Sequence, residues 1–66
     1  MREYGLSIEP EYPDEAFEAL ADTVGDAVFT RTEAIKIIAN ILDIDHYDAV
    51  KYFENLLTNG NIHLLS

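Results

Sequence analysis

Two amphipathic segments joined by a very short turn constrain this chain most. The segments span residues 31–42 and 45–59, and apolar residues recur in both at helical spacing. In the first segment the apolar residues cover more than half of the helical wheel, and only Lys36, Asn40 and Asp43 mark a polar side. A helix that is this apolar must be covered on two sides. The pattern therefore predicts a pair of packed helices at the centre of the fold.

Residues with known capping roles mark where these two helices begin and end. Thr30 and Glu33 form a capping box, in which the Thr30 oxygen accepts from the Glu33 N–H and the Glu33 carboxylate reaches back. Asp45 is placed to cap the second helix. Gly60 follows that helix and suits the left-handed conformation that ends it.

The flanking residues predict a further helix and short strands. Tyr4 and Leu6 alternate with small or polar residues, which indicates a strand, and Pro13 suits the first position of a helix that stops at Gly25. Residues 61–65 read as a closing strand able to pair with residues 27–30. We expect a single small α+β domain over residues 1–66, with three helices and a two- or three-stranded sheet. Its expected elements are an N-terminal strand or arm at 1–12, helices at 13–24, 31–42 and 45–59, and strands at 27–30 and 61–65.

The order of these elements resembles a winged-helix domain, a branch of the helix-turn-helix superfamily. The resemblance lies in Phe29-Thr30, a capped helix, a short turn, a second helix, then Gly60 and Ile62, and it covers about residues 27–65. It implies that the helix at 45–57 corresponds to the recognition helix, which enters the DNA major groove. Only one closing strand follows the second helix, so we expect no β-hairpin wing, and either the N-terminal strand supplies the missing partner or the sheet has two strands.

The charge opposes DNA binding. The chain has 13 acids and 4 Lys or Arg residues, a formal net charge of −9. Residues 1–26 hold eight acids and one base, while residues 27–66 hold five acids and three bases. Affinity for a phosphate backbone comes mainly from Lys and Arg. The acidity therefore belongs to the front of the chain, and nucleic acid is the weaker hypothesis for the partner.

Two surfaces are candidate partner sites. The first is the acidic face of the helix at 13–24, where Asp14, Glu18 and Asp22 follow at intervals of four residues and Glu15 lies beside them. Such a row either keeps the protein soluble, adapts it to high salt, or mimics phosphates toward a basic protein. The second is the outer face of the helix at 45–59, which carries Tyr47, Asp48, Lys51, Glu54 and Asn55. Lys and Asn can read base edges, and an exposed Tyr is a typical interface anchor.

The sequence also favours a homodimer over a monomer. The helix at 31–42 and its turn carry Ile37, Ile41 and Ile44, and a chain of 66 residues has little else to cover them.

Catalysis, metal binding and membrane insertion are not indicated. There is no Cys, and His46 and His63 are far apart in sequence with no Cys or Ser constellation around them, so no nucleophile–base–orienter arrangement is indicated. The acidic turn from Asp43 to Asp48 lacks the Gly and the final Glu of a calcium loop, and helix capping explains its acids better. No apolar run approaches the roughly 18 residues of a membrane span, and the N-terminus lacks the apolar region of a secretory signal. We expect no cofactor and a cytoplasmic location.

Taken together, these features favour a small acidic regulatory module, not an enzyme, that binds a protein. Its most specific form is an inhibitor or DNA mimic directed at a protein that handles nucleic acids. The alternative is a dimeric DNA-binding regulator that reads DNA through Arg31, Tyr47, Lys51 and Asn55.

Overall fold

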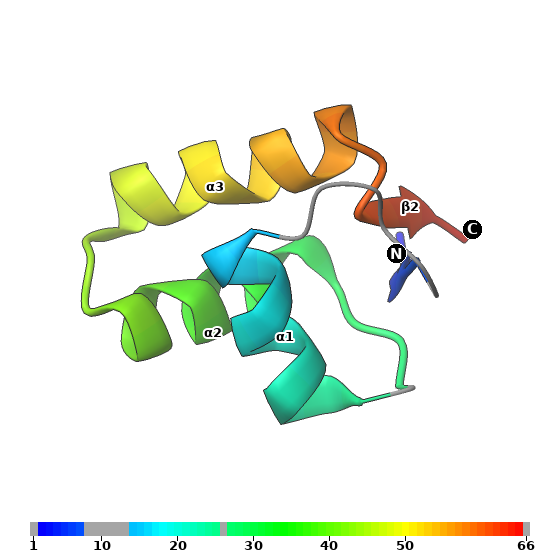
Figure 1. Cartoon of the computed structure of the whole chain (residues 1–66), viewed down its shortest axis with the longest axis horizontal. Coiled ribbons are helices and arrows are strands. Elements are labelled where there is room, and N and C mark those ends of the chain that lie inside the picture. The colour runs from blue at the N-terminus through cyan, green and yellow to red at the C-terminus, as the bar shows by residue number, and fades with distance from the viewer. Residues whose placement is uncertain (1, 8–13, 26, 66) are drawn as a thin grey trace.

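The structure, a computed structural model, describes residues 2–7, 14–25 and 27–65. The described residues form three helices and two short strands, and Figure 1 shows the strands gathered beyond the C-terminal end of α3. In chain order the elements are β1 (Tyr4–Leu6), α1 (Glu15–Val24), α2 (Arg31–Leu42), α3 (His46–Thr58) and β2 (Ile62–Leu64). The small α+β fold predicted from the sequence is confirmed.

Helix α1 begins at Glu15, two residues later than predicted. Asp14 is its N-cap: the backbone of Asp14 is extended, and its carboxylate accepts a hydrogen bond from the Ala16 N–H at 3.2 Å. An N-cap residue lies outside the helix by definition, so α1 starts after Asp14. Pro13 itself lies outside the described residues. At the other end Gly25 has a φ of 58°, and its N–H donates to the Ala21 carbonyl, so the predicted stop is confirmed.

The predicted caps of α2 and α3 are confirmed. Thr30 Oγ1 accepts from the Glu33 N–H at 3.2 Å, and the Thr30 hydroxyl is also hydrogen-bonded to Glu33 Oε1 at 3.1 Å. The Glu33 carboxylate therefore reaches back to the Thr30 side chain, as the capping box predicts. Asp45 accepts from the Asp48 N–H at 2.8 Å, so α3 starts one residue after the predicted boundary.

Both of these helices end in a turn with a left-handed residue. After α3, Gly60 has a φ of 78°, and the Asn61 N–H donates to the Leu56 carbonyl at 2.9 Å. This is the bond that defines a Schellman motif. After α2 the same bond runs from the Ile44 N–H to the Ala39 carbonyl at 3.1 Å, but the left-handed residue is Asp43, with a φ of 54°. The sequence showed no glycine there and did not predict this conformation.

The sheet differs from the predicted pairing. Strand β2 does not pair with residues 27–30; it pairs antiparallel with β1, with Tyr4 opposite Leu64 and Leu6 opposite Ile62. The predicted strand at 27–30 is reduced to a single bridge, in which Phe29 and Tyr4 exchange two backbone hydrogen bonds of 2.8 and 3.0 Å.

The reason for the short bridge lies in the neighbours of Phe29. Ala27 and Val28 are exposed, and Thr30 is committed to capping α2, so Phe29 alone holds a buried strand position. The backbone of Tyr4 is hydrogen-bonded to Phe29 along one edge of β1, and β2 pairs along the other edge. Strand β1 therefore lies between Phe29 and β2. The predicted N-terminal strand is confirmed over Tyr4–Leu6, while residues 8–12 of the expected arm lie outside the described residues.

The hydrophobic core joins all five elements. The Tyr4 ring meets the Phe53 ring edge to face, with centroids 5.2 Å apart and planes at 86°. Phe29 and Phe53 are buried, whereas Phe17 is only half-buried at the edge of the core. The buried apolar cluster consists of Tyr4, Ala16, Leu20, Phe29, Ala34, Ile35, Ile38, Ala49, Phe53, Leu56 and Ile62.

Candidate functional site

The acidic face of α1 is solvent-exposed, with one change from the prediction. Glu15, Glu18 and Asp22 are exposed, whereas Asp14 is half-buried because it caps the helix. None of these four carboxylates forms an ion pair within the described part of the chain. The face is therefore a row of three exposed carboxylates continued by a capping one.

The carboxylates on α1 differ in how far each one stabilises or destabilises the helix. Glu15 and Glu18 lie in the first turn, where the helix dipole favours negative charge. Asp22 lies near the C-terminal end, and no basic residue is present in the last turn. Asp22 is also four residues from Glu18, a spacing at which like charges repel. Asp22 is therefore the carboxylate that the helix tolerates least.

The outer face of α3 is exposed as predicted but is not basic. Its residues Tyr47, Asp48, Lys51, Glu54 and Asn55 are all exposed, and Tyr47 retains 67% of its accessible surface. The Lys51 ammonium lies 4.7 Å from the centroid of the Tyr47 ring, which is a cation–π contact. The single cation on this face is thus already engaged, and two carboxylates flank it one turn away on either side.

Arg31 likewise points back to the protein. Its guanidinium lies 5.8 Å from the centroid of the Phe53 ring, although the residue as a whole is exposed. Arg31 therefore covers the core at the start of α2 and would have to leave Phe53 to contact a phosphate.

The predicted dimer face is largely covered by the chain itself. Ile37 and Ile44 are half-buried and pack against the core, and Ile41, 51% exposed, is the one of the three that faces solvent. The expectation that this small chain could not cover all three residues is therefore wrong for two of them. A homodimer through this face stays a prediction with less apolar surface to support it.

The acidic turn between α2 and α3 serves the helix ends. Asp43 occupies the left-handed position after α2, and Asp45 caps α3. Across residues 2–7, 14–25 and 27–65, no three His, Cys, Asp or Glu side chains are grouped so that they could hold a metal ion.

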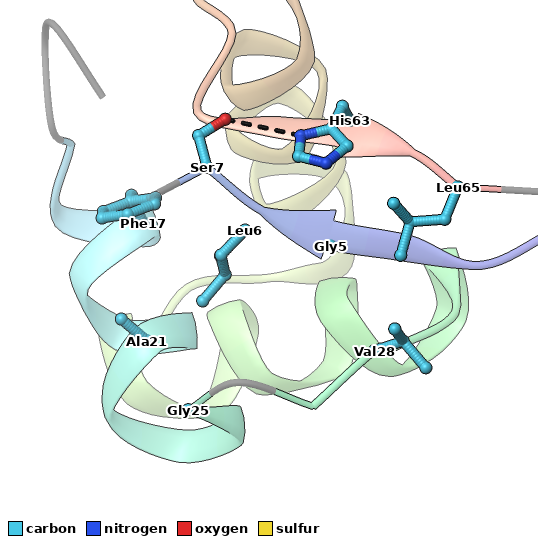
Figure 2. A pocket seen from close by; sticks show the side chains of 9 residues that line it. All are labelled: Gly5, Leu6, Ser7, Phe17, Ala21, Gly25, Val28, His63 and Leu65. Carbon is cyan, nitrogen blue, oxygen red and sulfur yellow. Dashed lines mark hydrogen bonds between the residues drawn. The ribbon is translucent and has the colours of Figure 1, made fainter. Parts of the chain in front are cut away.

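A further surface feature was missed at the sequence level: an apolar groove between α1 and the outer face of the sheet (Figure 2). It has a volume of about 590 Å³. Val28 and Leu65 on its walls are 51% and 48% exposed. The residues that line it are Gly5, Leu6, Ser7, Phe17, Ala21, Gly25, Val28, His63 and Leu65.

The groove has one polar corner. The Ser7 hydroxyl donates to the Gly60 carbonyl, and Ser7 Oγ lies 3.5 Å from His63 Nδ1. Because the hydroxyl hydrogen is used by Gly60, the contact with His63 requires a hydrogen on Nδ1. This pair fixes a hydroxyl and an imidazole at one end of an otherwise apolar surface (Figure 2).

The sequence contained one signal for this groove. Val28 and Leu65 are large apolar residues in segments where Phe29 and Ile62 already occupy the core positions. Alternation along an extended segment turns neighbouring residues to opposite faces, so these two had to point outward.

Comparison with protein-family models, with curated protein sequences and with solved structures found no match to this chain. In the part of the chain that the structure describes, no helix combines the length and the hydropathy needed to cross a membrane.

Proposed function

We propose that this protein is a small cytoplasmic regulatory module, without catalytic activity, that acts by binding another protein through the acidic surface of α1. The observation that carries the proposal is the row of exposed carboxylates, Glu15, Glu18 and Asp22, without ion-pair partners in the described residues. Keeping Glu18 and Asp22 one turn apart costs helix stability, and a repulsive arrangement kept at such a cost is typical of a functional surface.

The chemistry of this surface favours a basic partner. A row of carboxylates presents negative charge at regular intervals and steers a positively charged surface through long-range attraction. Surfaces that bind nucleic acid are basic, so the most specific form of the proposal is an inhibitor that competes with nucleic acid for such a protein.

The alternative is a DNA-binding regulator with a winged-helix-like arrangement. It is supported by the short turn between α2 and α3 and by the exposure of Tyr47, Lys51 and Asn55 on α3. It requires Lys51 to leave the Tyr47 ring. It also requires the outer face of α3 to approach phosphates although that face carries the carboxylates of Asp48 and Glu54. The acidic-surface proposal requires neither rearrangement, so it ranks first.

A capture experiment with matched charge variants tests the proposal. The wild-type chain, a Glu18→Gln/Asp22→Asn variant and an Asp48→Asn/Glu54→Gln variant are immobilised and exposed to lysate of the source cells. The two variants lose the same charge from different helices. We expect proteins held by the wild type and by the α3 variant to be lost from the α1 variant. Equal capture by all three would refute the proposal.

A second measurement separates the alternative. A labelled library of DNA duplexes is titrated with the chain at low salt, where phosphate contacts are strongest. We expect no binding. Binding that weakens steeply as salt rises, and that is lost on Lys51→Gln, would establish the DNA-binding function instead.

A further inference from the structure

The groove beside α1 has the properties of a binding site for a protein segment. On α1, Phe17 and Ala21 lie one turn apart and line one wall. Val28 and Leu65 add apolar surface that is about half exposed. Apolar side chains that are exposed together, and not singly, mark interaction sites.

Gly5 shapes the floor of the groove. A Cβ atom at this position would lie 3.0 Å from Leu65 Cδ1, closer than side chains normally approach. The absence of a side chain at Gly5 therefore allows Leu65 to lie across β1 (Figure 2). A single Leu side chain covers this part of the sheet, so the floor is apolar and open to a partner's side chain.

The rim of the groove on the α1 side is acidic. Successive helical residues are rotated by about 100°, which places Glu18 about 60° from Ala21 on the solvent side. Asp14, the N-cap residue, lies at the start of the same helix, three residues before Phe17. A segment that enters the groove would therefore run beside two carboxylates.

We propose that the groove binds a short segment of a partner protein that inserts apolar side chains and carries Lys or Arg residues beside them. This inference rests on the proposed function and specifies how the partner docks. A volume of about 590 Å³ is in the range of sites that take a ligand of a few side chains. The apolar walls supply affinity, and the carboxylates of Asp14 and Glu18 select basic flanks.

Charge argues against a second copy of the chain as the occupant. Each copy carries a net charge of −9, and α1, which forms one wall of the groove, carries the exposed carboxylates of Glu15, Glu18 and Asp22. Two copies docked through this face would bring their acidic rims together. A basic segment meets the same rim with attraction.

A peptide selection provides the test. A display library of random twelve-residue peptides is selected against the full chain, and the enriched peptides are labelled for fluorescence anisotropy. We expect enrichment of peptides with closely spaced Leu, Ile or Phe residues and neighbouring Lys or Arg. Their affinity should fall about tenfold or more for Val28→Ser/Leu65→Ser, because the apolar contacts are lost. It should fall several-fold and become less salt-dependent for Glu18→Gln.

A matched control excludes a general loss of structure. Ile41 is as exposed as Val28, at 51%, but lies on α2 and does not line the groove. Ile41→Ser should leave peptide affinity within about twofold of the wild type. Helical content from circular dichroism, measured for every variant, shows that each one is folded.

The outcomes separate this inference from the proposed function. If basic peptides lose affinity for Glu18→Gln but not for Val28→Ser/Leu65→Ser, the groove is not their binding site. That result would overturn the groove proposal and keep the acidic-surface proposal. Peptides that respond to neither set, or no enrichment at all, would overturn both. Dimerisation in sedimentation runs that is abolished by Val28→Ser/Leu65→Ser would assign the groove to a second copy and overturn the peptide proposal.

Discussion

Replacing Asp22 by Asn should make the protein more stable, because this carboxylate is unfavourable in two ways. It lies one turn from Glu18 on the same face of α1, and relief of one such pair is worth about 0.2–0.5 kcal/mol. It also lies near the C-terminal end of the helix, where removing a negative charge is worth about 0.3–1 kcal/mol at low salt. Because both side chains are exposed, we take the lower part of these ranges.

The expected gain is therefore about 0.5–1 kcal/mol in the free energy of unfolding at low ionic strength. For a domain of this size, that gain raises the midpoint of thermal unfolding by about 4–7 °C. Circular dichroism during heating, at about 10 mM and at about 1 M salt, measures the shift. At the higher salt the Debye length is about 3 Å, so the gain should largely disappear.

Glu15→Gln is the control, since it removes one charge from the same helix. Glu15 lies in the first turn, where the dipole favours a carboxylate, so this change should lower the midpoint slightly or leave it unchanged. If both variants were stabilised equally, the net charge of −9 and not the position along α1 would explain the effect. An Asp22→Asn variant that is no more stable than the wild type at low salt would refute the reasoning.

Three further substitutions test the interactions that hold the fold. Asp43→Gly should stabilise the protein by about 0.5–1 kcal/mol in urea unfolding, because a left-handed residue with a charge at a helix C-terminus is replaced by glycine; an unchanged midpoint would contradict this. Asp45→Ala should cost about 1 kcal/mol in the same assay through loss of the α3 cap, while Asp45→Ser should retain most of the stability. Phe53→Ala should cost about 3–5 kcal/mol, which is enough to unfold a domain this small, and a cooperative transition at ordinary urea concentrations would be inconsistent with its central place in the core.

The helices could be predicted closely because their boundaries are set locally. The capping box at Thr30 and Glu33 and the cap at Asp45 involve residues three positions apart, and such interactions form whatever the rest of the chain does. The left-handed Asp43 was missed because glycine is the expected residue at that position. Here the packing of Ile44 against the core accompanies the turn and makes the conformation acceptable for Asp.

The sheet could not be predicted in the same way, since strand pairing joins residues far apart in sequence. Residues 27–30 and β1 are both short apolar candidates for pairing with β2, and periodicity does not rank them. What decides the pairing is that Thr30 caps α2, which leaves Phe29 as the one inward residue of its segment. Tyr4 then takes the central place, because its backbone bonds Phe29 while its ring packs edge-on against Phe53.

The groove follows from this pairing, which is why a reading along the chain missed it. Gly5 weakens a strand when it is considered alone, yet opposite His63 it leaves the space that Leu65 occupies. The same pairing places His63 and Leu65 across the groove from α1, the helix with the exposed carboxylates. An acidic face that served solubility alone would have no need of an apolar surface at its edge. Because α1 carries both the lining residues Phe17 and Ala21 and the exposed Glu18, the two surfaces should be tested as one binding surface, with Val28→Ser/Leu65→Ser and Glu18→Gln measured against the same peptides.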